Sequence, residues 1–354
     1  MEDLPLLPEE TSYLANILTI LGGGLLVIVS VVGNGLVIFV FAIDSNFRTL
    51  SNFYLASLAC TDFLIGLLVI PFGLIYQYNQ TWIYGVNYCQ VWLTLSYGLS
   101  CVSSSHLVFV AIDRYRIMFH GTNYLQQRKL SNMLESVGFV WVIGFWTASP
   151  IIADWSHVAV DPEVINHCMP KKTPSWVLLI NMMVFVIPAF LMMRLYTVVY
   201  LQLRKRLRKK ATQSPVTSNP LAPSTSNSNA RNEGVETKLI LPKLTVGATK
   251  NTSRNIRNIG EEVRKRKMQI CLQKEKKAAL TLGLLIGLFL ICWSPYLILT
   301  TIQAFSPDTK IPKIFNTTSA LFGWINSCGN CFVYVYVNKD FRKSLSKMFK
   351  CLWK

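Results

Sequence analysis

Long apolar stretches recur along the chain, separated by shorter polar segments. A helix needs about 20 apolar residues to cross a bilayer. One stretch, 53–76, contains a single charged residue, Asp62. Six others contain no Asp, Glu, Lys or Arg: 17–43, 89–112, 136–153, 176–193, 278–307 and 314–337. The pattern therefore predicts an all-α fold, a bundle of seven transmembrane helices over residues 17–337.

One connection between the predicted spans is long and polar, from about residue 207 to about 265. Its middle, 211–231, is rich in Ser, Thr, Asn and Pro and has almost no charged or aromatic residue. Such a composition cannot bury enough apolar surface to fold by itself, so we expect a disordered third intracellular loop. The basic flanks, 203–210 and 264–277, extend the neighbouring spans and can attract anionic lipid headgroups or form a partner-binding surface.

The last segment, 338–354, has a different periodicity. Phe341, Leu345 and Phe349 recur at helical spacing among four basic residues. This pattern predicts a short amphipathic helix on the membrane surface, within a cytoplasmic tail. Cys351 follows it and is a candidate for palmitoylation, although an unmodified thiol explains it equally well.

Composition indicates that lipid surrounds the apolar stretches. Of the residues, 51% are hydrophobic and 15% are charged, whereas soluble domains carry about 25% charged residues. The sequence has no nucleotide-binding glycine loop, zinc-ligand spacing or Ser/His/Asp set. We expect a membrane protein that is not an enzyme, with no nucleic-acid partner and no cofactor beyond a bound ion.

The net charge of +17 is unevenly distributed. Residues 1–16 contain no Lys or Arg, and only four of the 35 basic residues lie in the loops on the same side, at positions 171, 172, 310 and 313. Basic loops stay in the cytoplasm. We therefore predict an extracellular N-terminus over 1–16, a cytoplasmic C-terminus and a multi-pass protein of the plasma membrane.

Asp62 is the one acidic residue deep inside a predicted span. Ionisable groups in that position are costly and usually functional. Other spans supply neutral polar side chains: Asn34, Ser103, Asn326, Ser327 and Asn330. A carboxylate among neutral oxygens suits a small hard cation, and a structural hydrogen-bond centre is the alternative.

The cytoplasmic end of the third span carries Asp113-Arg114-Tyr115, and Glu275 lies at the start of the sixth. An ion pair between Arg114 and Glu275 would hold these spans together. Breaking it would open a cavity, which is how a two-state switch behaves.

Pro188 and Pro295 lie inside predicted spans. Each removes a backbone hydrogen bond and bends its helix. Trp293 lies two residues before Pro295, so a bulky indole is beside a predicted bend. Simple core packing explains it, and so does a side chain that moves when a ligand binds.

The chain has nine cysteines, but only Cys89 and Cys168 face the oxidising side in the predicted topology. A disulfide between them is the natural pairing and would hold the second outer loop over the bundle. Two glycosylation sequons, at Asn79 and Asn316, lie on the same side.

Taken in order, these residues resemble the rhodopsin-like family of G-protein-coupled receptors, from Ile17 to about Lys350 except in the long loop. The motifs that carry the resemblance are Gly33-Asn34, Leu58-Ala59-Cys60-Thr61-Asp62, Trp82-Ile83-Tyr84-Gly85, Asp113-Arg114-Tyr115, Trp141, Pro188 with Tyr196, Cys292-Trp293-Ser294-Pro295, and Asn326-Ser327 with Asn330 to Tyr334. Each motif is weak alone, but together and in order they are highly specific.

The resemblance implies a function and several roles. It implies signalling to a heterotrimeric G protein, with receptor kinases and arrestin as further partners. It implies an allosteric sodium site formed by Asp62, Ser103, Asn326, Ser327 and Asn330. It also implies an activation switch that involves Asp113, Arg114, Tyr115, Tyr196, Glu275 and Tyr334.

Within the family, Trp92, Tyr97 and Tyr296 resemble the amine receptors, especially the histamine and muscarinic types. The Asp with which such receptors bind the ligand's ammonium is replaced here by Ser96, and the Glu of some histamine receptors by Val184. The outer rim offers other carboxylates as ammonium partners: Asp154, Asp161 and Glu163.

Two other positions depart from the family. Cys331 stands where the seventh span usually has Pro, so this helix is not forced to bend. Trp324 stands where an opsin carries the Lys that binds retinal, which excludes light sensing by that chemistry.

We therefore predict a receptor for an extracellular small molecule, amine-like in its resemblance. The predicted ligand pocket consists of Ser96, Tyr97, Ser100, Asn181, Val184, Trp293, Tyr296 and Trp324. The alternatives are a peptide or lipid receptor of the same fold, a constitutively active or decoy receptor and, from another class, a transporter or channel.

Overall fold

The structure is a computed structural model that describes residues 9–45, 47–153, 168, 174–212, 250–306, 308–309, 311–337 and 339–352. Every element among these residues is a helix, which confirms the predicted all-α class. The elements are α1 (Glu9–Ile28), η1 (Val29–Gly33), α2 (Asn34–Ile43), α3 (Leu50–Leu64), η2 (Ile65–Val69), α4 (Ile70–Asn79), α5 (Gly85–Gln127), α6 (Leu130–Ala153), α7 (Pro174–Asn181), η3 (Met182–Val186), α8 (Ile187–Thr212), α9 (Lys250–Phe305), α10 (Lys313–Val337) and α11 (Lys339–Leu352).

The three η elements are single π-helical turns inside longer helices. Thus α1, η1 and α2 follow one another without a break, as do α3, η2 and α4, and again α7, η3 and α8. Such turns inside α-helices are frequent at functional sites. Here η1 and η2 pack against each other and α10 packs against both, so they lie where three helices meet.

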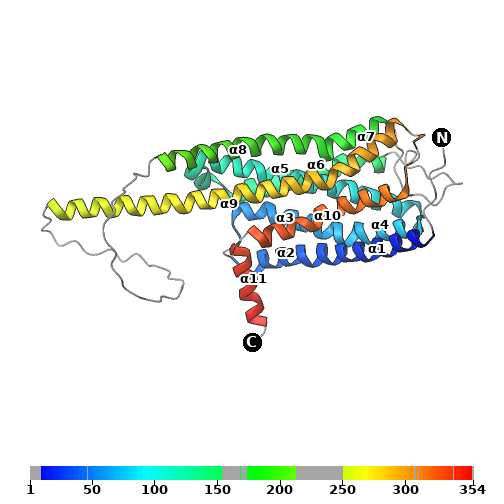
Figure 1. Ribbon diagram of the computed structural model, residues 1–354, viewed down its shortest axis with the longest axis horizontal. Helices are drawn as coiled ribbons and strands as arrows, with labels where there is room; N and C mark the ends of the chain where they lie inside the picture. The colour runs from blue at the N-terminus through cyan, green and yellow to red at the C-terminus, as the bar shows by residue number, and fades with distance from the viewer. Residues whose placement is uncertain are drawn as a thin grey trace. The chain divides into compact units, whose positions relative to one another are not determined.

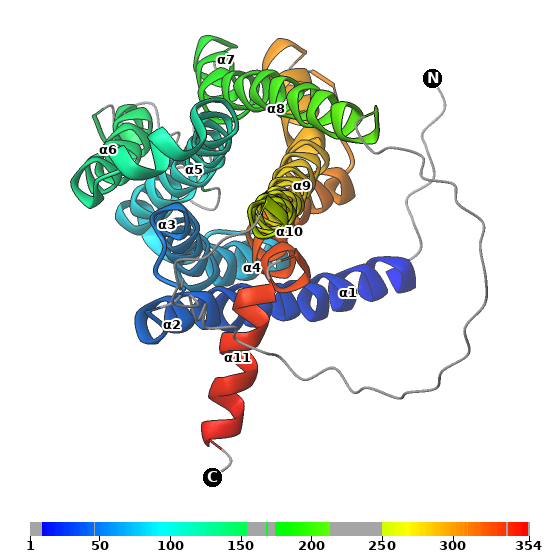
Figure 2. The same cartoon turned by 90° about the vertical axis from the view of Figure 1, so that its left-hand side faces the viewer.

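The chain divides into two units, a larger one of Met1–Gln202 with Lys277–Lys354 and a smaller one of Leu203–Lys276. Figures 1 and 2 show that the helices of the larger unit lie side by side and run in a common direction, except α11, which runs across it. Helices that follow each other along the chain are neighbours, as α2 and α3 or α5 and α6 are, and α10 returns to pack against α1 and α3.

Five helical stretches among the described residues are long and apolar enough to cross a membrane: Ile17–Ile43, Leu50–Asn79, Gly85–Gly121, Pro174–Arg208 and Glu275–Phe305. The other two predicted spans correspond to α6 and α10, which have 24 and 25 residues. At 1.5 Å per residue each is about 36 Å long, enough for a hydrocarbon core of about 30 Å.

The outward faces of these helices are apolar. On α6, Val142 is 66% exposed and Trp146 is 76% exposed, and Phe139 lies on the same exposed surface. In water, an apolar face of this kind would drive association with other molecules. In a bilayer it meets acyl chains, so these side chains fit a helix surrounded by lipid.

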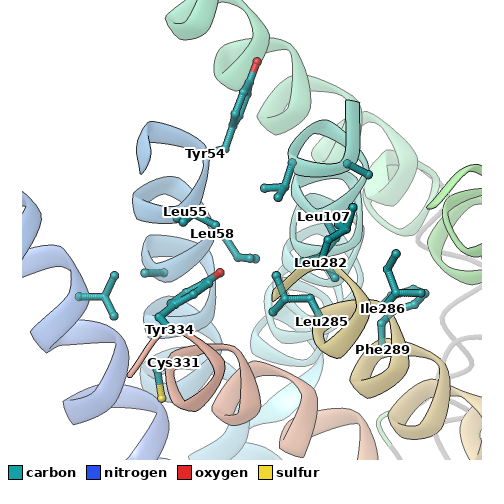
Figure 3. Close-up of a cluster of buried hydrophobic side chains, with 14 of the residues drawn as sticks. Tyr54, Leu55, Leu58, Leu107, Leu282, Leu285, Ile286, Phe289, Cys331 and Tyr334 are labelled. Carbon is teal, nitrogen blue, oxygen red and sulfur yellow. The ribbon is translucent and has the colours of Figure 1, made fainter. Parts of the chain in front are cut away.

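The core of the larger unit lies between α3, α5, α9 and α10. Figure 3 shows Leu58, Leu107, Leu285 and Tyr334 pointing toward one another from these four helices. Lipid is as apolar as these side chains, so the hydrophobic effect does little to hold helices together here. Close van der Waals packing and hydrogen bonds between helices stabilise the bundle instead.

The long connection is shorter than predicted. Residues 213–249 of the predicted loop lie outside the described residues, but α8 continues to Thr212 and α9 already begins at Lys250. The predicted bounds of 207 and 265 were therefore too wide. Both flanks are rich in Lys and Arg, which are good helix formers, and this explains why the helices continue beyond the apolar runs.

Candidate ligand-binding and signalling site

A cavity of about 220 Å³ lies inside the larger unit. Its wall includes Trp92 and Tyr97 of α5, Trp293 and Tyr296 of α9, and Trp324 of α10. Pockets for drug-sized ligands measure about 300–1,000 Å³. This cavity is smaller, so it suits a compact molecule.

Seven of the eight residues predicted for the ligand pocket line this cavity: Ser96, Tyr97, Ser100, Asn181, Trp293, Tyr296 and Trp324. They come from α5, α7, α9 and α10, which are far apart in the sequence. The structure brings these residues together around one space, and their use by a ligand stays a prediction.

Val184 is the exception. It lies in η3, only 3% exposed, packed in a cluster with Cys101 and Ile180 rather than on the cavity wall. Trp293 and Tyr97 pack against this cluster and also line the cavity. Val184 therefore supports the wall from behind.

Two hydroxyl groups join across the cavity. Tyr97 and Tyr296 form a hydrogen bond between their hydroxyls at 2.9 Å, which links α5 to α9. Ser96 donates to the carbonyl of Trp92 at 2.7 Å, and Ser100 donates to that of Ser96 at 2.6 Å. The two serines are thus satisfied by their own helix in the absence of other partners.

The amide groups on the cavity wall have partners that the sequence did not indicate. Asn181 donates to the hydroxyls of Thr300 and Thr301 at 3.2 Å each, and so ties α7 to α9. Gln303 donates to Oδ1 of Asn316 at 2.9 Å. Nothing in the sequence indicates which faces of these helices meet, since several polar residues lie at each helix end.

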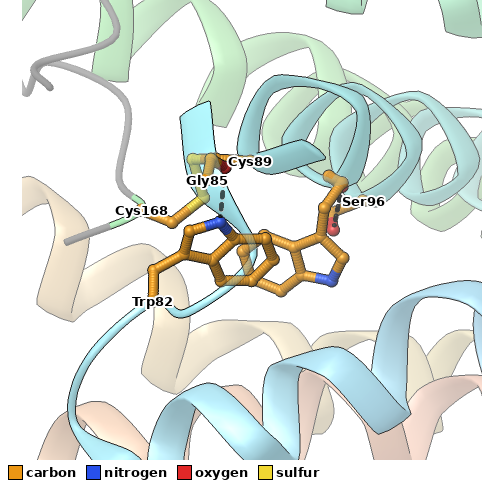
Figure 4. The surroundings of a disulfide bond; sticks show 6 residues. Trp82, Gly85, Cys89, Ser96 and Cys168 are labelled. Atoms are coloured by element: carbon orange, nitrogen blue, oxygen red, sulfur yellow. Dashed lines mark hydrogen bonds between the residues drawn. A yellow bond between two sulfur atoms is a disulfide. The ribbon is translucent and has the colours of Figure 1, made fainter. Parts of the chain in front are cut away.

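A disulfide bond joins Cys89 at the start of α5 to Cys168, as predicted. Figure 4 shows this bond beside Trp82, whose indole nitrogen donates to the carbonyl of Gly85 at 2.8 Å. Cys168 also lines the cavity. The disulfide bond therefore holds Cys168 in place on the wall of the cavity.

Asp62 is fully buried at the centre of a polar cluster. Ser103 donates to its Oδ1 at 3.2 Å and Asn330 donates to its Oδ2 at 2.8 Å. Ser30 donates to the main-chain carbonyl of Asp62 at 2.9 Å. A carboxylate from α3, a hydroxyl from α5 and a carboxamide from α10 therefore meet at one point.

The predicted ion-binding residues fit a small cation. Oδ1 of Asn330 is buried and has no hydrogen-bond partner among the described residues, so an oxygen lone pair remains available beside the carboxylate. Ser103, Asn326 and Ser327 also line the cavity. Ser103 thus connects the cavity to the Asp62 carboxylate.

Asp113 is held by a residue that the sequence did not indicate. Its Oδ1 accepts from Arg128 at 2.8 Å, and the side chains of these residues are only 2% and 9% exposed. Ser51 and Tyr124 also donate to the Asp113 carboxylate, at 2.9 and 3.2 Å. Gly121, with φ of 53°, turns the chain inside α5, and only glycine adopts this conformation easily.

Glu275 lies in the smaller unit, where it accepts from Arg206 of α8 at 2.7 Å. Arg114 belongs to the larger unit. The predicted ion pair of Arg114 with Glu275 would join residues of the two units, and it stays a prediction. The structure adds Arg206 as a partner of Glu275, which the sequence did not single out among the many basic residues nearby.

The remaining switch residues lie near the core. Tyr334 is 2% exposed, and its hydroxyl has no hydrogen-bond partner among the described residues. The Tyr196 hydroxyl lies 2.8 Å from where a side chain at Gly283 would begin, so α8 and α9 approach closely here. The ring of Tyr115 packs on Phe119 at 4.6 Å between centroids.

The modification candidates differ in accessibility. Asn79 ends α4 and is exposed. Asn316 lies within α10, half-buried and hydrogen-bonded to Gln303, which argues against a glycan there. The side chain of Cys351 lies outside the described residues, as do the rim carboxylates Asp154 and Asp161, with Glu163.

Comparison with known proteins supports the family resemblance seen in the sequence. Residues 33–334 match the family described as "7 transmembrane receptor (rhodopsin family)". The 5-hydroxytryptamine receptor 1A-alpha of Takifugu rubripes is 27% identical, over 98% of this chain and 90% of that protein. The 5-hydroxytryptamine receptor 1F of Homo sapiens is 29% identical, over 85% and 84%. The "Probable G-protein coupled receptor No18" of Amphibalanus amphitrite is 27% identical, over 96% and 88%.

Proposed function

Because the chain belongs to the rhodopsin-like family of seven-transmembrane receptors, we propose that it passes a signal from an extracellular small molecule to a heterotrimeric G protein. Proteins of this family are receptors in the plasma membrane, not enzymes. The proposed ligand is amine-like in its size and aromatic contacts. The cavity carries the proposal, since seven predicted pocket residues from four helices line it.

A route from the cavity to the core supports signal transfer. Trp293 lines the cavity, and its ring lies 6.4 Å from that of Phe289, one turn along α9. Phe289 is fully buried and stacks on Phe185 at 5.4 Å. A ligand that displaces Trp293 therefore acts on a tightly packed core, and packed cores change between discrete arrangements.

We also propose that a sodium ion binds beside Asp62. The carboxylate would supply the charge, and Ser103 and Asn330 would supply neutral oxygens. Since Ser103 and Asn326 line the cavity as well, a ligand there and an ion at Asp62 are coupled through shared residues. Receptor kinases, arrestin and anionic lipids are proposed as further partners of the tail and the long loop.

A positively charged amine is a second candidate for the ligand. Similar proteins carry the name 5-hydroxytryptamine receptor, which favours it. Its ammonium would need a counter-charge, and the rim carboxylates lie outside the described residues. Replacing Asp154, Asp161 and Glu163 by neutral amides, singly and together, would show whether any response to serotonin depends on them.

The test is nucleotide exchange on a panel of G proteins, using membranes that contain the full chain. Exchange is measured without ligand and with serotonin, histamine and their N-acetyl derivatives. We expect Arg114→Ala to abolish any exchange above that of empty membranes, since Arg114 is the proposed contact with the G protein. Arg116→Ala is the matched control, because Arg116 is an exposed basic residue on the same helix.

Exchange that persists in Arg114→Ala would contradict the proposed switch. No exchange with any G protein, from protein shown to reach the cell surface, would contradict coupling itself and favour the decoy receptor. Solute flux across vesicles that contain the chain would favour the transporter or channel.

A further inference from the structure

We infer that the ligand of this cavity is uncharged, a compact molecule with an aromatic or apolar body and a hydrogen-bond acceptor. The inference rests on the proposed function, because it takes the cavity to be the ligand site. It concerns the class of ligand and not the signalling step, so the two can fail separately.

The polar groups on the cavity wall are neutral. They are hydroxyls and carboxamides: Tyr76, Gln77, Ser96, Tyr97, Ser100, Ser103, Asn181, Tyr296, Thr300, Gln303, Asn316, Ser319, Asn326 and Ser327. No described residue of the wall is Asp, Glu, Lys, Arg or His. These groups can exchange hydrogen bonds with a neutral ligand, but they cannot neutralise a full charge.

Asp62 is a poor counter-ion for an ammonium in the cavity. It is fully buried and does not line the wall. Both of its carboxylate oxygens already accept hydrogen bonds, from Ser103 and Asn330. The same negative charge disfavours an anionic ligand, so a neutral molecule fits best.

Aromatic rings do not compensate for the missing charge. Four tryptophans line the cavity: Trp92, Trp176, Trp293 and Trp324. The attraction of a cation to an aromatic face is weaker than the cost of removing an ion from water. The rings therefore serve better as flat walls for an aromatic ligand.

Asn326 indicates that the ligand has an acceptor. This residue lines the cavity and is 2% exposed, and its Nδ2 has no hydrogen-bond partner among the described residues. A buried donor without a partner is destabilising, because it has lost its hydrogen bonds to water. A carbonyl or hydroxyl oxygen of the ligand would satisfy it, whereas an ammonium would repel its N–H groups.

The test uses three probes with one indole skeleton: N-acetyltryptamine, tryptamine and N,N,N-trimethyltryptammonium. Thermal unfolding of the purified full-length receptor measures binding, since a ligand of the folded state raises the Tm. We expect N-acetyltryptamine to raise the Tm at concentrations at least about tenfold lower than the two cations, a difference of about 1.4 kcal/mol.

A substitution then reverses the preference. Ser96 lines the cavity, so Ser96→Asp places a carboxylate on its wall. We expect this variant to bind tryptamine at least about tenfold more tightly than the wild type, that is, by about 1.4 kcal/mol. Ser96→Asn, of the same shape and without the charge, should keep the preference of the wild type. If Ser96→Asp does not fold, Ser100→Asp, one turn further along the same wall, replaces it.

Several results would overturn the inference. Tryptamine that stabilises the wild type as well as N-acetyltryptamine does would show that a counter-charge is present. Stabilisation by the trimethyl probe alone would identify an aromatic cage for cations. A wild type that does not respond to N-acetyltryptamine, or a carboxylate variant that gains no tryptamine binding, would also count against it. Normal Tm shifts without nucleotide exchange would contradict only the proposed signalling.

Discussion

Gly33 and Cys331 are in close contact, with no room for a side-chain atom at position 33. A Cβ atom at Gly33 would lie 2.5 Å from Sγ of Cys331, which is 4% exposed and donates to the carbonyl of Cys328 at 3.0 Å. We expect Gly33→Ala to destabilise the receptor by about 1–3 kcal/mol, the usual cost of overpacking a core. The measurement is the Tm of the purified receptor.

Two other variants control this prediction. Gly35→Ala should have little effect, because its Cβ would lie 3.6 Å from the nearest atom, on Phe63. Combining Gly33→Ala with Cys331→Ala removes the colliding sulfur and should restore part of the lost stability. If the double variant is no more stable than Gly33→Ala, the collision with Cys331 is not the cause.

At the scale of the helices, the backbone turn at Gly121 lies near the end of α5. It allows Arg128, just after α5, to form an ion pair with Asp113. Removing one partner of a buried ion pair costs about 3–5 kcal/mol, because the other charge is left uncompensated. In Arg128→Ala the freed carboxylate is next to Arg114 in the chain. We therefore expect a lower Tm together with lower basal nucleotide exchange, since Arg114 becomes bound to Asp113.

Arg116→Ala is the control for Arg128→Ala. Its guanidinium lies 6.0 Å from the centre of the Tyr124 ring, whereas the ion pair of Asp113 is with Arg128. We therefore expect neither readout to change in Arg116→Ala. Higher basal exchange in Arg128→Ala would instead mean that the Asp113–Arg128 pair holds the receptor in its inactive state.

The sequence predicted the spans because a stretch of apolar residues is a local property, visible without knowing the neighbours. Seven of the eight residues predicted for the pocket line the cavity, because the family resemblance marks these positions one by one. Other residues of its wall, such as Thr300 and Gln303, were not predicted. The sequence could not predict the bonds from Arg128 to Asp113 or from Asn181 to Thr300. Such contacts depend on how each helix is rotated, and π-helical turns such as η3 alter that rotation without a clear signal in the sequence.

For the whole molecule, orientation in the membrane follows from charge, and glycosylation can test it. Asn79 is exposed at the end of α4, and the charge asymmetry predicts that it lies outside the cell. We expect a glycosidase to increase the gel mobility of the receptor from cells, and Asn79→Gln to remove this shift. Asn316→Gln should leave the shift unchanged, since Asn316 is half-buried and bonded to Gln303. A glycan at Asn251, in the sequon that precedes the sixth span, would mean that the predicted orientation is inverted. No shift at all would show that Asn79 is not used.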